Sequence, residues 1–518
     1  MSKHGHREPS QSISKDDYIK RIPPLSAEIN YAPAAAYYPS FAGRGTLMFE
    51  SVKGSHKIAR YSFIAFEPYC EYCVRDKEQT LVMADGKSKK PSGHPVSTLR
   101  ELIASYNQSP DPELPPFQGG AAGLISYDFM HYLERVPTTT TDDLRVPDLH
   151  MFLFDRLLAF DHMEQKAWAV VCPGARNASI IDKGIDTGID TGTPSDMYDQ
   201  AKKELRNILM RAVPSPLEAL RANNRNGENG GRPQINYDVT QEQYESMVVR
   251  AKEYIAAGDI FQANLSLRLS ADMGARSPWD LYLALREINP SPFSGFMDFG
   301  DYVIAGSSPE RLVMVRGNIV ELRPIAGTRP RGHDSVEDER LRSELLLNPK
   351  ERAEHIMLID LERNDIGRVC GYGSVEVDEL MVTEDYSHVI HIVSNVRGSL
   401  APGKDCLDAL KATFPGGTIT GVPKVRCMEI IDELESLRRG PYTGSMGYLG
   451  FGGSMDINII IRTFVIRDNK AYVQAGSGIV ADSEPTGEYH ESLNKAEALI
   501  KALNWGATSG GVPTGTPT

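Results

Sequence analysis

Short β-rich runs recur along almost the whole chain and constrain its fold more than any other feature. Before residue 172 they include Tyr61–Phe66 and Trp168–Val171, and after Asn236 they include Asp259–Leu269. Helical patterns separate some of these runs, and turns separate the others. We therefore expect an α+β fold built on large antiparallel β-sheets.

The best-marked helix follows Thr240, which forms a capping box with Gln243 and precedes an apolar stripe that ends at Gly258. Other helices are expected at 96–106 and 195–221, and further strands at 303–306, 312–315, 446–451, 457–464 and 471–476.

Two polar, glycine-rich segments break the chain near its middle. The first, 173–194, contains Gly-Ile-Asp-Thr twice in succession, and the second spans 222–233. Such composition is typical of surface insertions or linkers. We expect disordered ends and the following division: disordered N-terminus 1–16, β-rich domain 17–172, linker or insertion with a helix 173–235, second domain 236–506, and disordered tail 507–518.

The composition excludes several classes of function. The formal net charge of −13, from 69 acidic and 56 basic residues, argues against a nucleic-acid surface and an anionic membrane. Six cysteines are too few for a disulfide framework. The N-terminus lacks the apolar core of a signal peptide, and no apolar run reaches the roughly 18 residues of a membrane helix. We therefore expect a cytoplasmic protein.

Four glutamates form two matched pairs. Glu351 and Glu354 are three residues apart, as are Glu488 and Glu491. Residues three apart share one face of a helix, and two such faces turned toward each other would offer an all-oxygen site to a hard cation such as Mg²⁺. Two simpler interpretations remain open: solvated helix charge, or a capping box that involves Glu351.

Several ordered segments of the second half together resemble the chorismate-utilising enzyme family. The matching segments are, in chain order, Gly258-Asp-Ile-Phe-Gln-Ala-Asn-Leu-Ser, Ser308-Pro-Glu-Arg-Leu, Pro324-Ile-Ala-Gly-Thr-Arg-Pro-Arg-Gly, Glu354-His-Ile-Met-Leu-Ile-Asp-Leu-Glu-Arg-Asn-Asp, His388-Val-Ile-His, Gly417-Thr-Ile-Thr-Gly-Val-Pro-Lys, Ala475-Gly-Ser-Gly and Glu491-Ser-Leu-Asn-Lys-Ala. The first half matches more weakly, through Leu47-Met-Phe-Glu-Ser-Val and Arg60-Tyr-Ser-Phe-Ile.

The resemblance implies two large antiparallel β-sheets packed face to face, with helices outside and with the two halves interleaved. It implies that 236–506 is the chorismate-binding catalytic domain and that 17–172 has a regulatory role. It also implies that the four glutamates bind Mg²⁺.

The resemblance is strongest to the branch that converts chorismate and ammonia to anthranilate and pyruvate, the first step of tryptophan biosynthesis. Glu310 matches the general acid that protonates the leaving C4 hydroxyl. His391 matches the histidine of the elimination step, with His388 as its neighbouring competitor. The implied substrate contacts are Gly327, Thr328, Thr418, Tyr442, Arg462, Gly476, Gly478 and Lys495.

Two positions distinguish among the reactions of the resembling enzymes. Gln262 stands where the branch that adds water has a lysine base, and glutamine cannot deprotonate water. Ala326 stands where the aminodeoxychorismate branch has a nucleophilic lysine. Both favour anthranilate, whereas Phe293-Ser294 is similar to the aminodeoxychorismate branch, so this alternative stays open. A noncatalytic sensor that binds chorismate or tryptophan is the third alternative.

The resemblance also implies two partners besides chorismate. No cysteine lies in the Gly-x-Cys-x-Gly turn of a glutaminase, so a separate glutamine amidotransferase subunit is expected to supply ammonia. Glu50, Ser51, Pro292 and Phe293 match a regulatory site for tryptophan. The simpler interpretation is that Glu50 and Ser51 cap a turn.

Overall fold

The computed structural model describes residues 23–55, 57–106, 108–177, 194–217, 233–385 and 389–505. The ends that were predicted to be disordered, 1–16 and 507–518, lie outside the described residues. So do His388 and parts of the linker 173–235.

Twelve strands form the first sheet, and all of its pairs are antiparallel. Their order is β1 (Leu25–Ile29), β10 (Lys166–Val171), β9 (Arg156–Asp161), β3 (Tyr61–Ala65), β2 (Leu47–Glu50), β13 (Phe293–Asp298), β14 (Tyr302–Ser308), β23 (Thr463–Arg467), β24 (Lys470–Ile479), β12 (Gln262–Asp272) and β11 (Ile235–Tyr237), with β20 (Gly421–Val422) also on β12.

The second sheet also has twelve antiparallel strands. Their order is β17 (Ile325–Pro330), β19 (Val389–Ser399), β16 (Ile319–Leu322), β15 (Arg311–Arg316), β22 (Met455–Asn458), β21 (Ser445–Gly450), β7 (Gly120–Ile125), β8 (Leu149–Phe154), β4 (Cys70–Arg75), β5 (Glu78–Met83) and β6 (Ser88–Lys89), with β18 (Glu376–Asp385) on β19.

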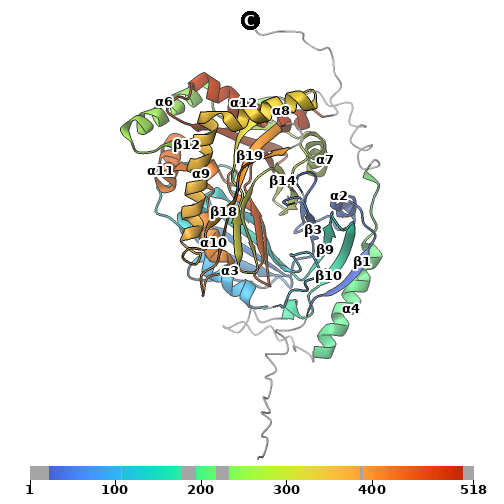
Figure 1. Ribbon diagram of the computed structural model, residues 1–518. Coiled ribbons are helices and arrows are strands. Elements are labelled where there is room, and N and C mark those ends of the chain that lie inside the picture. The colour runs from blue at the N-terminus through green and yellow to red at the C-terminus, as the bar shows by residue number, and fades with distance from the viewer. Residues whose placement is uncertain are drawn as a thin grey trace, which may run out of the picture.

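The sheets pack face to face through an apolar layer that includes Leu47 and Ile304 of the first sheet and Leu124 and Phe152 of the second. Two further apolar layers join the outer faces of the sheets to helices. Figure 1 shows these helices on the outside of the sheets. The predicted fold class is therefore confirmed. The longer helices are α3 (Pro95–Ala104), α4 (Pro194–Arg211), α6 (Gln241–Ala257), α7 (Pro278–Ile288), α8 (Ser335–Leu347), α9 (Pro349–Gly367), α10 (Cys406–Thr413), α11 (Lys424–Leu434) and α12 (Pro485–Leu503), and α2 (Ala34–Tyr37) is a single turn.

The two halves of the chain share both sheets. In the first sheet β2 pairs with β13, so that Glu50 lies opposite Ser294. In the second sheet β7 pairs with β21, so that Leu124 lies opposite Met446. The expected interleaving is thus present, and 17–172 and 236–506 contribute to one common core.

Most of the expected elements are present, but the strand predicted over 457–464 is wrong. The chain forms β22 and β23 instead, and these strands belong to different sheets. Arg462, just before β23, has a φ of 51°, a left-handed conformation that no regular strand accommodates. By contrast, the capping box of Thr240 and Gln243 and the left-handed Gly258 at the end of α6 are as predicted.

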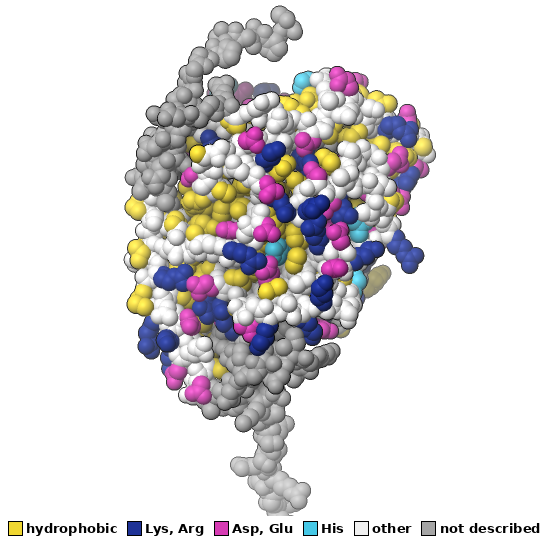
Figure 2. All heavy atoms as spheres, turned by 180° about the vertical axis from the view of Figure 1, so that it is seen from behind, with side chains coloured by type: hydrophobic (Ala, Val, Ile, Leu, Met, Phe, Trp, Pro, Cys, Tyr) yellow, Lys and Arg dark blue, Asp and Glu magenta, His cyan; other side chains and the backbone are white. Residues whose placement is uncertain are grey.

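Acidic and basic side chains are interspersed on the face shown in Figure 2, beside a recessed apolar area. Among the described residues, no helix is both long and apolar enough to cross a membrane.

Glu50 anchors the junction between the two halves from inside the protein. Its side chain is only 3% exposed. Arg286 of α7 donates to both of its carboxylate oxygens, at 2.7 and 2.9 Å, and the Tyr282 hydroxyl donates at 2.8 Å. This carboxylate therefore fastens α7 onto β2.

We predict that Glu50→Ala lowers the free energy of unfolding by about 3–5 kcal/mol, because it leaves the Arg286 cation buried without its counter-charge. Urea unfolding followed by circular dichroism measures the change. Glu28→Ala, at an exposed position of β1, is the control and should stay within about 0.5 kcal/mol of the parent protein. A loss for Glu50→Ala no larger than that of the control would contradict the anchoring role.

Candidate active site

The candidate active site lies where the chain passes twice between the sheets. One crossing joins β14 to β15 and contains Glu310, and the other joins β22 to β23 and contains Arg462. Backbone hydrogen bonds hold the crossings together: the Ile459 N–H donates to the Glu310 carbonyl at 3.0 Å, and the Ser307 N–H donates to the Arg462 carbonyl at 3.1 Å. The two predicted residues therefore become neighbours.

Glu310 has the environment of an acid that keeps its proton near neutral pH. The side chain is 6% exposed, and burial raises its pKa to about 7. The Thr418 hydroxyl donates to it at 2.9 Å, and the positive charges of Arg462 and Lys495 oppose the increase in pKa. Glu310, Thr418, Arg462 and Lys495 are thus brought together as predicted.

His391 lies on β19 opposite Thr328 of β17. Its Nδ1 is 3.2 Å from the Gly327 carbonyl oxygen and 3.1 Å from the Thr328 hydroxyl. Because a carbonyl can only accept, this arrangement assigns the proton to Nδ1 and makes Nε2 the basic nitrogen. Burial, and then the charge of Arg462, lower the histidine pKa to about 4. The ring is therefore neutral at physiological pH.

The β17–β19 ladder contains a bulge between Ala326 and Thr328, and Gly327 in that bulge has a φ of 62°. A Cβ there would lie 2.9 Å from Oε2 of Glu351 and 3.0 Å from Leu345. Glycine therefore allows both the turn and the close approach of a predicted metal ligand. Ala326 is half-buried beside this turn, opposite Ile392.

Gly476 and Gly478 lie on β24, where they pair with Ser266 and Asn264 of β12. A Cβ on Gly478 would be 2.3 Å from Nε2 of Gln262, so the Gln262 amide lies directly over this glycine. Lys495 of α12 donates to the Gly476 carbonyl at 3.1 Å. These contacts place the predicted glycines, Gln262 and Lys495 along one edge of the site.

Tyr442 occupies the loop before β21 and is 7% exposed. The Arg439 guanidinium lies 5.6 Å from its ring centre and also donates to Glu435 at 2.7 and 2.9 Å. Burial raises the pKa of the Tyr442 hydroxyl, which therefore remains a neutral hydrogen-bond donor at physiological pH.

The four predicted metal ligands lie near one another on α9 and α12. Burial, together with the charges of Glu351, Glu491 and Glu488, raises the pKa of Glu354, and Lys350 opposes this increase. Individual contacts also hold the other three: Arg329 donates to Glu351 at 3.2 Å, Ser483 to Glu488 at 2.6 Å and Lys495 to Glu491 at 2.9 Å.

Carboxylate oxygens are suitable ligands for Mg²⁺, and the mutual repulsion at Glu354 is what a bound cation would relieve. In the described residues, however, no three acidic, histidine or cysteine side chains converge closely enough to form a finished metal site. The four glutamates therefore have the right chemistry for Mg²⁺. Binding of the ion would require their present partners, such as Arg329 and Lys495, to move aside.

Glu362 was not predicted as a site residue; it is a buried carboxyl whose pKa is raised first by burial and then by the charge of Glu310. A signal was available: Glu362 lies about two helical turns after Glu354 on α9.

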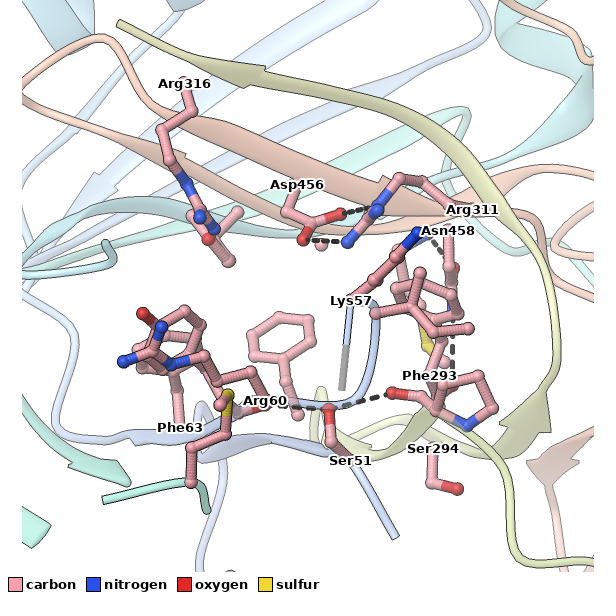
Figure 3. A pocket seen from close by; sticks show the side chains of 18 residues that line it. Ser51, Lys57, Arg60, Phe63, Phe293, Ser294, Arg311, Arg316, Asp456 and Asn458 are labelled. Atoms are coloured by element: carbon pink, nitrogen blue, oxygen red, sulfur yellow. Dashed lines mark hydrogen bonds and ion pairs between the residues drawn. The ribbon is translucent and has the colours of Figure 1, made fainter. Parts of the chain in front are cut away.

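A cavity of about 280 Å³ lies between the sheets, apart from the candidate active site. Ser51, Pro292 and Phe293 line it, as Figure 3 shows for Ser51 and Phe293. Arg311 stacks over Phe293 and forms a bidentate pair with Asp456 at 2.8 and 3.0 Å. Three of the four residues predicted for a tryptophan site thus meet here, whereas Glu50 faces α7.

Several known proteins are similar to this chain in sequence or structure. A family model described as chorismate binding enzyme matches residues 45–501. Over 457 residues the chain is 43% identical to anthranilate synthase component 1 of Acetivibrio thermocellus, covering 88% of this chain and 89% of that protein. Over 457 residues it is also 41% identical to aminodeoxychorismate synthase component 1 of Bacillus subtilis strain 168, covering 88% and 91%. The crystal structure of anthranilate synthase component I from Streptococcus pneumoniae TIGR4 matches with a TM-score of 0.71 and 35% identity, covering 86% of this chain and 95% of that one.

The chain therefore belongs to the chorismate binding enzyme family. It is a chorismate-utilising enzyme similar to anthranilate synthase component 1. The Bacillus subtilis relative, named aminodeoxychorismate synthase component 1, is nearly as similar, and overall similarity therefore does not choose between these two kinds of enzyme.

Proposed function

We propose that this enzyme converts chorismate and ammonia to anthranilate and pyruvate, with Mg²⁺ as cofactor. The observation that carries the proposal is Glu310, a buried carboxyl with a pKa of about 7 between the cations Arg462 and Lys495. Chorismate is a dianion with a poor leaving group, so it needs cationic partners and an acid in one place.

In this mechanism Glu310 donates its proton to the C4 hydroxyl, which leaves as water while ammonia bonds to C2. The Thr418 hydroxyl bond orients the carboxyl and stabilises the anion that remains. Arg462 grips a substrate carboxylate with parallel N–H donors, and Tyr442, Gly476 and Gly478 are further proposed contacts. A general acid of this kind contributes about 10²–10⁴-fold to the rate.

His391 is the proposed base of the second stage. With its proton on Nδ1 and a pKa lowered to about 4, the neutral ring can accept the C2 proton at Nε2 as pyruvate leaves and the ring becomes aromatic. Gly327 and Thr328 hold the imidazole in this orientation.

Glu351, Glu354, Glu488 and Glu491 are the residues that would hold the magnesium ion. Bound there, Mg²⁺ would withdraw electron density from the ring carboxylate of chorismate and so promote loss of the hydroxyl.

The ammonia is proposed to come from a separate glutamine amidotransferase subunit. Five of the six cysteines are buried, and burial raises the pKa of the remaining one, Cys73, to about 12. No cysteine is therefore a ready thiolate nucleophile, which supports an external source of ammonia.

The proposed reaction predicts both the product and the dependence on the metal. Chorismate with ammonium and Mg²⁺ should yield fluorescent anthranilate and an equal amount of pyruvate, and chelation should abolish both. Glu354→Gln should raise the Mg²⁺ concentration needed for half-maximal rate, whereas Asp360→Asn, at an exposed position of α9, should not. An amination product that keeps its pyruvyl group would favour the aminodeoxychorismate reaction. Absence of turnover would favour a noncatalytic sensor that binds chorismate or tryptophan.

The second prediction concerns Ala326. Alanine has no nucleophile, so C2 stays open to ammonia. Ala326→Lys should suppress anthranilate at least tenfold, and Ala326→Met, which has similar bulk without the amine, should suppress it less. Chromatography of the products measures both variants. Equal anthranilate output from Ala326→Lys and the parent would show that this position does not select the product.

We further propose that the cavity beside Phe293 binds L-tryptophan as an inhibitor. Its lining combines the aromatic rings of Phe63 and Tyr448 with the cations Arg60 and Arg316, which suits an aromatic amino acid.

Ser51→Phe should fill this cavity and weaken inhibition by tryptophan, because the added ring takes the space of the ligand. Ser51→Thr should keep inhibition, since it retains the hydroxyl. Initial rates against tryptophan concentration test both variants. If tryptophan up to millimolar concentration leaves the parent rate unchanged, the cavity does not serve this ligand.

A further inference from the structure

Glu362 is a buried carboxyl that the mechanism above does not use. It lies on α9 and is 8% exposed. Among the described residues, no group donates to or accepts from its Oε2. A buried carboxylate without a donor is costly, so the side chain needs either its own proton or a partner supplied during the reaction.

The packing of the chain brings the helix of Glu362 near Glu310. A Cβ on Gly417 would lie 2.2 Å from Cδ2 of Leu361, so the turn that contains Thr418 lies directly against α9. Thr418 in turn donates to Glu310. Glu362, the residue after Leu361, is close enough for the charge of Glu310 to affect it.

Three charged groups face Glu362: Glu310 from the crossing between the sheets, Asp365 from α9 and Lys424 from α11. Lys424 pairs with Asp365 and donates to the Thr413 carbonyl at 3.0 Å. Arg368 also donates to Asp365, at 3.3 Å. Lys424 is thus already paired with another carboxylate, that of Asp365.

Within the part of the chain that the structure describes, Lys424 is the cation whose charge acts on Glu362, and Asp365 shares it. Burial, then the charges of Glu310 and Asp365, raise its pKa well above the ordinary range, and Lys424 only partly opposes this. Burial without a hydrogen-bond donor on Oε2 among the described residues thus favours the neutral acid form of this side chain.

We propose that Glu362 is a second proton-carrying residue of the site, which returns a proton to Glu310 after each turnover. The inference rests on the proposed function. Glu362 acts through Glu310 and is a positioning residue, because it is not required to touch the substrate.

The proton transfers balance over one cycle. Glu310 gives its proton to the C4 hydroxyl, the C–O bond breaks, and water leaves. Glu362 then gives its proton to the Glu310 carboxylate, and the nearby Lys424 cation stabilises the Glu362 anion. The nitrogen that has added to C2 carries an excess proton and releases it to water, and the Glu362 carboxylate takes a proton from water, so that both acids are protonated again.

Glu362→Gln separates this role from a structural one, because the amide keeps the shape and neutrality but carries no transferable proton. With enzyme in excess, a single turnover of chorismate should proceed at the parent rate, because Glu310 starts protonated. In steady state the rate should fall several-fold, because Glu310 must recover its proton by a slower route. Glu362→Asp should restore much of the steady-state rate, and Asp360→Asn on the same helix is the matched control.

Two outcomes would overturn the proposal: single-turnover and steady-state rates that fall together, or neither rate changing. Absence of turnover in the parent protein would instead count against the proposed function. The protonation of Glu362 is then tested separately, without substrate.

That test is thermal stability against pH. Glu362 keeps its proton in the folded state but loses it above about pH 4.3 in the unfolded chain. The unfolded state therefore binds fewer protons, and this residue lowers stability as pH rises above that value. The melting temperature of Glu362→Gln relative to the parent should increase steadily from pH 5 to pH 8. A difference that is constant over this range would show that Glu362 is charged, and would refute the proposal.

Discussion

The arrangement of the candidate active site depends on two adjacent segments in which the chain crosses from one sheet to the other. The β14–β15 crossing contains Glu310, the β22–β23 crossing contains Arg462, and backbone hydrogen bonds between them hold the two side by side. These bonds satisfy groups that would otherwise be buried without partners. Because each crossing is tied to both sheets, the acid and the cation keep their relative position as long as the sheets stay packed.

Burial then gives the two central titratable groups opposite properties. It raises the pKa of Glu310 to about 7 and lowers that of His391 to about 4, since both groups become more neutral when water is removed. The result is a carboxylic acid and a basic imidazole in one site near neutral pH. Such a pair supports an elimination in which one group gives a proton and another removes one.

Local patterns predicted much of the fold because they depend on near neighbours. The capping box of Thr240 and the helical face of Glu351 and Glu354 follow from hydrogen bonds and geometry within a few residues. The same reasoning failed over 457–464. The residues of this segment are typical of a strand throughout. Long-range backbone hydrogen bonds to Ser307 and Glu310 nevertheless accompany a crossing to the other sheet at Arg462.

The sequence by itself determined the family and the candidate residues for its chemistry, because the motifs contain Glu310, His391, Gly327 and the glutamate pairs one by one. Only the tertiary structure decided what surrounds them. It turned Glu50 away from the cavity that Ser51 lines, and it left Glu362 buried where the charge of Glu310 acts on it. The physical reason is that burial and charge are set by residues hundreds of positions apart, which sequence spacing cannot report.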